Sequence, residues 1–431
     1  MTILKQDCPV TQCTFGNSFH FFGYYEKPQW DLSGKYLLGL EVPPIKRYMK
    51  YDDIATIGMI NLENQFEFIP LAQTTAWNWQ QGAALTWLDQ FDDGNWITFN
   101  SRKKDGPGYE ATLLNIKTKE QRNLPMGIYN VTPDDRYGLS LDFKRLRYTH
   151  PTIGYAEPNE EPSSSDRPND AGEVARPVDH PADDGLFRMD MQTGEIKLIV
   201  DLESTFQIEH DPSMDGAVHW FTHPVPSPSG HRVLFIHRYA REISKRHYWS
   251  YRLMTASIEG GDIYVLDKSL SPHALAELDP NITEEAVIKS RHEHGYSHDL
   301  WLDDDHPMSW GYRPGGAHYH IYTDKSKEVS ILGEDCLTEN GHYSFCPVNS
   351  DWMLSDHYPD SENMQTLFLY QMSTGTRIDV ARFFHDPEQS GHCRCDLHPR
   401  WSRDGRKVCV DSTHNRDRQM FLVDVSSITK A

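Results

Sequence analysis

A repeated pattern constrains the fold of this 431-residue chain more than any other feature of its sequence. The segments "PQWDLSGKYLLGLEV" (28–42) and "PRWSRDGRKVCVDST" (399–413) both contain Pro-x-Trp, a tight turn with Gly, and an alternating apolar strand. Related segments occupy 85–102, 129–143, 224–238, 300–312 and 344–358. Each predicts two strands joined by a short Asp/Ser/Gly turn.

Further strand pairs follow several of these segments, for example "GLFRMDMQTGEIKLIV" and "LFLYQMSTGTRIDVA". About four strands in each of seven copies predict an all-β chain, a seven-bladed β-propeller that forms a single domain over 1–431. An irregular pair of β-sandwiches is the alternative.

Two stretches interrupt the pattern. Residues 157–184 are rich in Pro, Asp, Glu and Ser, so we expect a mobile loop that buries no core. Residues 241–257 are basic and aromatic, and we expect a long loop or a short helix there.

The composition limits the classes of partner. A formal net charge of −21 argues against nucleic acid, and an anionic substrate would need a local basic pocket. The 11 Trp and 21 Tyr are numerous, and such rings often line sugar-binding surfaces. We expect no membrane span. Seven scattered Cys and no leader pattern in "MTILKQDCPVTQCTF" predict a cytoplasmic protein, and the sequence leaves the oligomeric state open.

Several segments together resemble a set of propellers that act on uronic-acid glycans: "HFFGYYEKPQWDLSGKYLL", "WNWQQGAALTWL", "SLDFKRLRYTHPTIGYA", "HWFTHPVPSPSGHRVLFIHR", "ENGHYSFCPVNSDWMLSDHYPD" and "CDLHPRWSRDGRKVCVDSTH". The set comprises oligogalacturonate lyases, propeller-type ulvan lyases and enzymes that cleave rhamnose–glucuronate linkages. The resemblance covers nearly the whole chain. It implies a polysaccharide or oligosaccharide lyase whose partner is an acidic oligosaccharide.

Such a lyase removes the C5 proton of a uronate by β-elimination, which requires a base, an acid and neutralisation of the carboxylate. His223 in "HWFTHP" is our candidate base, and Arg238 in "FIHRY" is our candidate carboxylate clamp. His237 and Arg238 point to opposite faces of an alternating strand, so at most one enters a shared site. We keep His237 as a candidate for substrate binding. The alternative for each His is a core residue bonded to a backbone carbonyl.

The resemblance adds further candidates. Tyr155 in "THPTIGYA" matches the end of a Gly-x-Gly-Tyr-like stretch in the ulvan lyases, which implies an acid or base role. Its alternative is a Tyr that caps a blade edge. Gln81 in "WNWQQG" is implied near the substrate. Arg145 and Arg400 are further candidates for substrate binding, although a solvated strand face would also explain Arg145.

The segment "CRCDLHP" (393–399) is dense in metal-binding side chains. In an extended stretch Asp396 and His398 share a face. Oligogalacturonate lyases bind a divalent metal through three His and a Gln; His342 and His398 match two of these His, Asp396 replaces the third, and Cys393 falls near the Gln. His298 begins its own repeat in the same way, so His298, His342, Asp396 and His398 are the predicted ligands of a divalent ion: manganese, calcium or zinc. The alternative is a hydrogen-bonded structural plug.

Two rival functions remain. A glycoside hydrolase on the same scaffold, for example one that cleaves rhamnose–glucuronate linkages, would usually need two carboxylates flanking the bond, and the sequence offers no convincing pair. A non-catalytic propeller that binds glycan would need no groups that transfer protons.

Overall fold

The computed structural model describes residues 2–158, 175–244, 248–269, 295–313 and 316–429. Its strands form seven sheets, and the chain has the predicted fold class, an all-β seven-bladed β-propeller. The chain divides into two compact units. The first comprises Met1–Gly127, Tyr155–Asp166 and Asn340–Ala431, and the second comprises Ile128–Gly154 and Arg167–Glu339.

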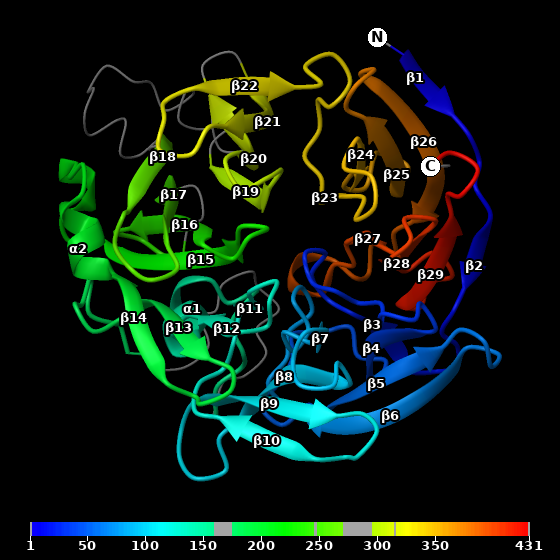
Figure 1. The fold of residues 1–431 in the computed structure, drawn as a ribbon, viewed down its shortest axis with the longest axis horizontal. Coiled ribbons are helices and arrows are strands. Elements are labelled where there is room, and N and C mark those ends of the chain that lie inside the picture. Colours follow the sequence, from blue (N-terminus) through cyan, green and yellow to red (C-terminus); the bar gives the residue numbers. More distant parts are fainter. Residues whose placement is uncertain (1, 159–174, 245–247, 270–294, 314–315, 430–431) are drawn as a thin grey trace. The chain divides into compact units, whose positions relative to one another are not determined.

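The first unit contains four blades, drawn in blue, cyan, orange and red in Figure 1. Blade 1 consists of β3 (Phe19–Phe21), β4 (Tyr36–Val42), β5 (Ala55–Asn61) and β6 (Glu67–Thr74). Blade 2 consists of β7 (Thr86–Leu88), β8 (Trp96–Arg102), β9 (Tyr109–Asn115) and β10 (Gln121–Leu124). Blade 6 consists of β23 (Tyr343–Phe345), β24 (Trp352–Asp356), β25 (Met364–Gln371) and β26 (Thr376–Phe384). Blade 7 consists of β27 (Arg400–Trp401), β28 (Lys407–Ser412) and β29 (Gln419–Asp424), completed by β2 (Val10–Gln12).

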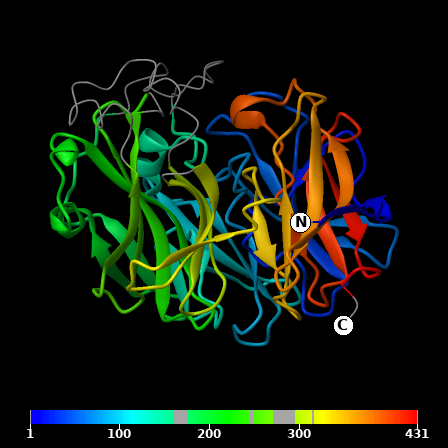
Figure 2. The same cartoon turned by 90° about the horizontal axis from the view of Figure 1, so that it is seen from above.

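The N-terminal segment joins two blades of this unit. Strand β1 (Thr2–Lys5) pairs in parallel with β26, and β2 then pairs antiparallel with β29. Figure 2 shows the strands of this unit from a second direction, with blade 6 in orange. Apolar faces of blades 6 and 7 pack together through residues such as Leu354, Val410 and Phe421.

The described residues of the second unit form three blades and two α-helices. Blade 3 consists of β11 (Asn130–Val131), β12 (Tyr137–Ser140), β13 (Gly185–Asp190) and β14 (Ile196–Asp201). Blade 4 consists of β15 (Val218–Pro226), β16 (Arg232–Ala240), β17 (Ser250–Ser257) and β18 (Tyr264–Ser269). Blade 5 consists of β19 (Tyr296–Trp301), β20 (Pro307–Arg313), β21 (Gly316–Tyr322) and β22 (Val329–Leu332). The helices are α1 (Phe143–Thr149) and α2 (Leu202–Gln207).

The Trp residues of three repeat copies link neighbouring blades. The indole nitrogens of Trp87, Trp301 and Trp401 donate to the carbonyls of Gln29 (2.9 Å), Val225 (3.0 Å) and Ser344 (3.4 Å), each in the preceding blade. A buried indole N–H needs an acceptor, and this bond fixes one blade against the next. The pattern read from the sequence is therefore a pattern of contacts between blades.

The structure can be compared with what the sequence suggested for three segments. The expected loop or helix over 241–257 is wrong in part, because Ser250–Ser257 is strand β17 in the middle of blade 4. The alternative of a solvated strand face for Arg145 is also wrong, because Arg145 is buried on helix α1, which Asp142 caps. Most of the expected mobile loop, residues 159–174, lies outside the described residues. No helix among the described residues is long and apolar enough to cross a membrane.

Candidate metal centre and surrounding residues

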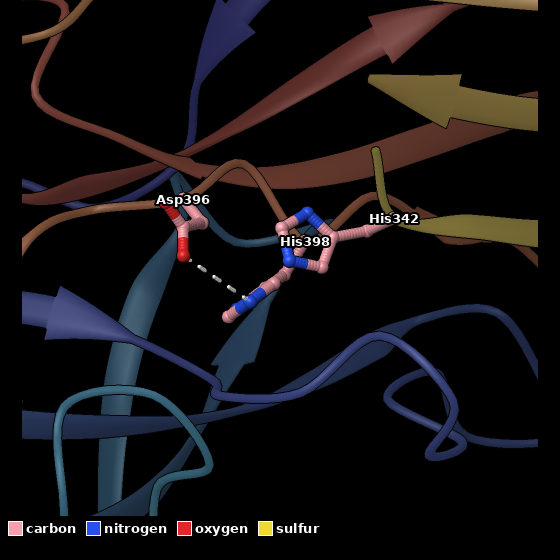
Figure 3. Close-up of side chains that lie close together, drawn as sticks. All are labelled: His342, Asp396 and His398. Carbon is pink, nitrogen blue, oxygen red and sulfur yellow. Dashed lines mark ion pairs between the residues drawn. The ribbon is translucent and has the colours of Figure 1, made fainter. Parts of the chain in front are cut away.

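Three side chains of the first unit converge where blades 6 and 7 begin: His342, Asp396 and His398 (Figure 3). One ligand atom from each lies within 4.8 Å of the others, and all three residues are buried. His398 Nε2 lies 3.9 Å from Asp396 Oδ2, and Asp396 Oδ1 is buried with no hydrogen-bond partner among the described residues. We call these three residues the triad.

A second carboxylate orients His342. Its Nδ1 lies 3.1 Å from both oxygens of Asp356, and Asp356 Oδ1 also accepts from the His342 backbone N–H at 2.7 Å. Nδ1 therefore carries the proton, which leaves Nε2 as the nitrogen with a lone pair for a metal. A Cβ on Gly341 would lie 1.8 Å from the Asp356 carbonyl oxygen, so only glycine permits this approach. Asp356 was not predicted from the sequence, where the Gly341-His342 pair is the signal of this contact.

The repeat itself positions His398. It has a left-handed φ of 41° and lies three residues before Trp401; Ala84 (53°) and His298 (59°) have the same relation to Trp87 and Trp301. Non-glycine residues rarely adopt this conformation, so surrounding contacts must hold it.

Buried Arg400 supplies such a contact, because its Nη1 donates to the His398 carbonyl at 2.6 Å. Arg400 also pairs with buried Asp411 at 2.7 Å and donates to Gln29 at 2.9 Å. Its role in substrate binding stays a prediction.

Aromatic rings pack around the triad. The ring centroids of Tyr24 and His398 lie 5.1 Å apart, those of Tyr25 and His342 5.4 Å, and those of Tyr358 and His342 5.5 Å. Tyr24 and Tyr25 are buried, and Tyr358 is partly exposed. The backbone N–H groups of Phe22 and Gly23, just before these two Tyr, donate to Asp411. One carboxylate thus anchors both this aromatic segment and Arg400.

The triad fits a divalent cation. Two imidazoles and a carboxylate are donors that manganese and zinc accept, and Asp396 Oδ1 lacks the hydrogen bond that a buried carboxylate oxygen requires. A purely structural plug would satisfy that oxygen. The geometry therefore supports metal binding by His342, Asp396 and His398.

The fourth predicted ligand, His298, belongs to the second unit and is described there alone. It lies in a bulge of β19, where the register shifts between Ser297 and Leu300. Its neighbour Asp299 is fully buried, and neither carboxylate oxygen has a hydrogen-bond partner among the described residues. Burial raises the pKa of Asp299 to about 6. Asp299 was not predicted from the sequence, and a role for His298 as a ligand stays a prediction.

Two of the three predicted catalytic residues lie in blade 4. His223 is partly exposed, has a φ of 53°, and lies in a bulge of β15 between Thr222 and Val225. Its ring centroid is 6.3 Å from that of His150, whose Nδ1 lies 3.4 Å from Arg238 Nη1. His150 therefore links the candidate base and the candidate clamp.

Tyr155, the third predicted catalytic residue, belongs to the first unit. It is buried, and its hydroxyl accepts a hydrogen bond from Asn100 at 2.8 Å. Burial raises the pKa of Tyr155, which keeps the phenol protonated. A catalytic role for Tyr155 stays a prediction.

His237 lies in a closed chain of hydrogen bonds in the second unit. Arg252 Nε donates to His237 Nδ1, and His237 Nε2 lies 2.9 Å from His219 Nδ1. His219 Nε2 in turn donates to the Met214 carbonyl at 3.1 Å. We call His219, His237 and Arg252 the relay; all three are fully buried. This is the alternative role considered for these His, and substrate binding by His237 stays a prediction.

The remaining two candidates, Arg145 and Gln81, form hydrogen bonds with other residues of the chain. Arg145 is buried on α1, where it pairs with Asp184 and donates to the carbonyls of His219 (3.0 Å) and Val178 (2.9 Å). Gln81 is buried in a turn, and its backbone N–H donates to Asn78 at 2.7 Å. For both residues, substrate binding stays a prediction.

Comparison with known proteins identifies the fold. No family model and no curated protein sequence matches this chain. Its structure is similar to an oligogalacturonate lyase from Vibrio parahaemolyticus, with 14% identity, 99% of this chain and 96% of that chain covered, and a TM-score of 0.62. It is also similar to an oligogalacturonate lyase in complex with manganese, with 14% identity, 97% and 93% covered, and a TM-score of 0.60.

A peptidase shares the fold as well. A puromycin-hydrolysing peptidase from Mycobacterium tuberculosis is 12% identical, with 99% of this chain and 55% of that chain covered and a TM-score of 0.53. At these identities the similarity shows the propeller fold alone. One fold can serve several functions, and the side chains of the site determine which function it has.

Proposed function

We propose that this chain is a lyase that cleaves an acidic, uronate-containing oligosaccharide by β-elimination, with a divalent metal held by His342, Asp396 and His398. The observation that carries the proposal is the convergence of these three buried donors, with Asp356 fixing the proton on His342. Support also comes from the fold, which the chain shares with an oligogalacturonate lyase that binds manganese.

The chemistry follows from what the uronate needs. A divalent ion at the triad would withdraw charge from the sugar carboxylate and so make the C5 proton more acidic. The Tyr24, Tyr25 and Tyr358 rings beside the triad suit the apolar face of a sugar. We keep His223 as the base, Tyr155 as the proton donor and Arg238 as a carboxylate clamp, each to be tested separately.

The test distinguishes elimination from hydrolysis. On a panel of uronate oligosaccharides, elimination leaves a C4–C5 double bond that absorbs in the ultraviolet and incorporates no solvent oxygen at the broken bond. Saturated products that carry solvent oxygen would establish a hydrolase. Binding without any cleavage would establish a glycan-binding propeller.

Variants then test the residues. Tyr155→Phe and His223→Ala should each lower the rate by about two orders of magnitude, the usual cost of losing an acid or base. Arg238→Ala should also lower turnover. The control is His231→Ala, an exposed His in the same blade as His223, which should leave the rate unchanged. Full activity in both the Tyr155 and His223 variants would contradict their assignment.

A further inference from the structure

One arginine lies directly beside the triad and takes no part in the arrangement described so far. Arg394 Nε donates to Asp396 Oδ2 at 2.8 Å. The Arg394 side chain is 32% exposed, whereas that of Asp396 is 1% exposed. Arg394 therefore extends from the buried triad toward solvent.

Two buried side chains hold the backbone of Arg394 by hydrogen bonds. Its carbonyl oxygen accepts from Gln80 Nε2 at 3.1 Å and from Arg418 Nη2 at 2.9 Å, and Arg418 Nη2 also donates to the Cys393 carbonyl at 2.6 Å. Gln80 and Arg418 are both buried. The side chain thus starts from a rigid point, which lowers the entropy cost of using it for binding.

The two terminal nitrogens of the Arg394 guanidinium, Nη1 and Nη2, can donate hydrogen bonds to a ligand. Only Nε is engaged, and neither Nη1 nor Nη2 donates a hydrogen bond to any residue that the structure describes. The guanidinium lies 5.9 Å from the ring centroid of Tyr358, the same ring that packs against His342. The partly exposed guanidinium therefore keeps two N–H groups without a hydrogen bond among the described residues, next to the triad and an aromatic ring.

We infer that Arg394 binds a sugar carboxylate through Nη1 and Nη2 and so selects uronate over neutral sugar at the triad. This inference rests on the proposed function, because it names the group that recognises the substrate of the same site. The planar fork matches the two oxygens of a carboxylate, and the pair is charge-assisted. In a chain of net charge −21, an anionic ligand needs such a local cation.

The experiment measures binding by calorimetry, with manganese-loaded protein and monosaccharides that have no glycosidic bond to cleave. The probes are galacturonate, glucuronate, methyl galacturonate ester and galactose. Arg394→Gln should weaken binding of the uronates by about 10- to 100-fold, the range for charge-assisted hydrogen bonds, with galactose and the ester unchanged. Arg394→Lys, which keeps the charge without the fork, should lose less.

Two controls separate recognition from structure. Arg382→Gln removes an exposed Arg of blade 6 that pairs with Asp360, and it should bind as wild type does. Elemental analysis of Arg394→Gln should show an unchanged manganese content. Loss of the metal would mean that Arg394 acts through Asp396 and would overturn the inference.

Two further results would overturn the inference: unchanged uronate affinity in Arg394→Gln, or equal losses for uronate and ester. Its failure is distinguishable from failure of the proposed function. If Arg394→Gln cleaves uronate oligosaccharides as fast as wild type does, the inference about Arg394 is wrong and the proposed lyase function stands. If uronate binding depends on Arg394 but no unsaturated product forms, the proposed lyase reaction is wrong and the inference about Arg394 stands.

Discussion

The triad in the first unit and the relay in the second are both buried and rich in histidine, but their donors and acceptors are balanced differently. In the relay, Arg252, His237, His219 and the Met214 carbonyl form an unbroken series of hydrogen bonds. In the triad, Asp356 fixes His342, but Asp396 keeps an oxygen with no hydrogen bond among the described residues. A closed series stabilises the fold, whereas a converging set with an unsatisfied acceptor can take a ligand.

The largest expected effect concerns the support beneath the triad. Asp411→Ala should lower the free energy of unfolding by about 3–5 kcal/mol, because it leaves the buried Arg400 guanidinium without its partner. Urea denaturation would measure the loss. Asp417→Ala, an exposed carboxyl in the same blade, should cost little. Equal stability of the two variants would mean that the pair does not hold this region.

A smaller effect is expected at the group that orients His342. Asp356→Asn should weaken manganese binding by about 10- to 100-fold, the usual cost of losing a carboxylate that fixes a metal-ligating His. Calorimetric titration with manganese measures it. The control is Asp360→Asn, whose side chain is exposed at the surface of the same blade. An unchanged affinity in Asp356→Asn would indicate that the ion binds elsewhere.

The relay predicts a dependence of stability on pH. Burial lowers the pKa of His219 to about 3, and burial followed by the Arg252 cation also lowers that of His237. Both rings are neutral when folded, so the unfolded chain binds more protons once the pH falls below its His pKa of about 6.5. The stability that His219 contributes is present above that value and should fall by about 2 kcal/mol between pH 7.5 and pH 5.

A variant isolates this contribution. His219→Gln removes the titrating ring and keeps a side chain able to form hydrogen bonds, so its stability should change less between pH 7.5 and pH 5. His231→Gln, at an exposed position in the same blade, should keep the wild-type dependence. Denaturation by urea at both pH values provides the comparison. An identical dependence in wild type and His219→Gln would show that the relay is not the source.

The sequence predicted the propeller because the repeat is local: the Trp residues of three copies, Trp87, Trp301 and Trp401, each donate to a carbonyl of the preceding blade. It also predicted that Asp396 and His398 share a face with His342 nearby. It did not reveal which His lie in a closed network of hydrogen bonds. The segments "HWFTHP" and "CDLHP" both contain His, and the hydrogen-bond partners that distinguish the two sites come from other parts of the chain. Arg252, which donates to His237, lies 15 residues further along the chain, on the neighbouring strand β17.

The most direct test of the account is manganese titration of chelator-treated wild type, His398→Ala and His219→Gln, with folding checked by circular dichroism. The account predicts about one ion per chain in wild type and in His219→Gln, and none in folded His398→Ala. Wild type that binds no divalent ion, or His398→Ala that binds it as wild type does, would contradict the claim that the triad is a metal centre.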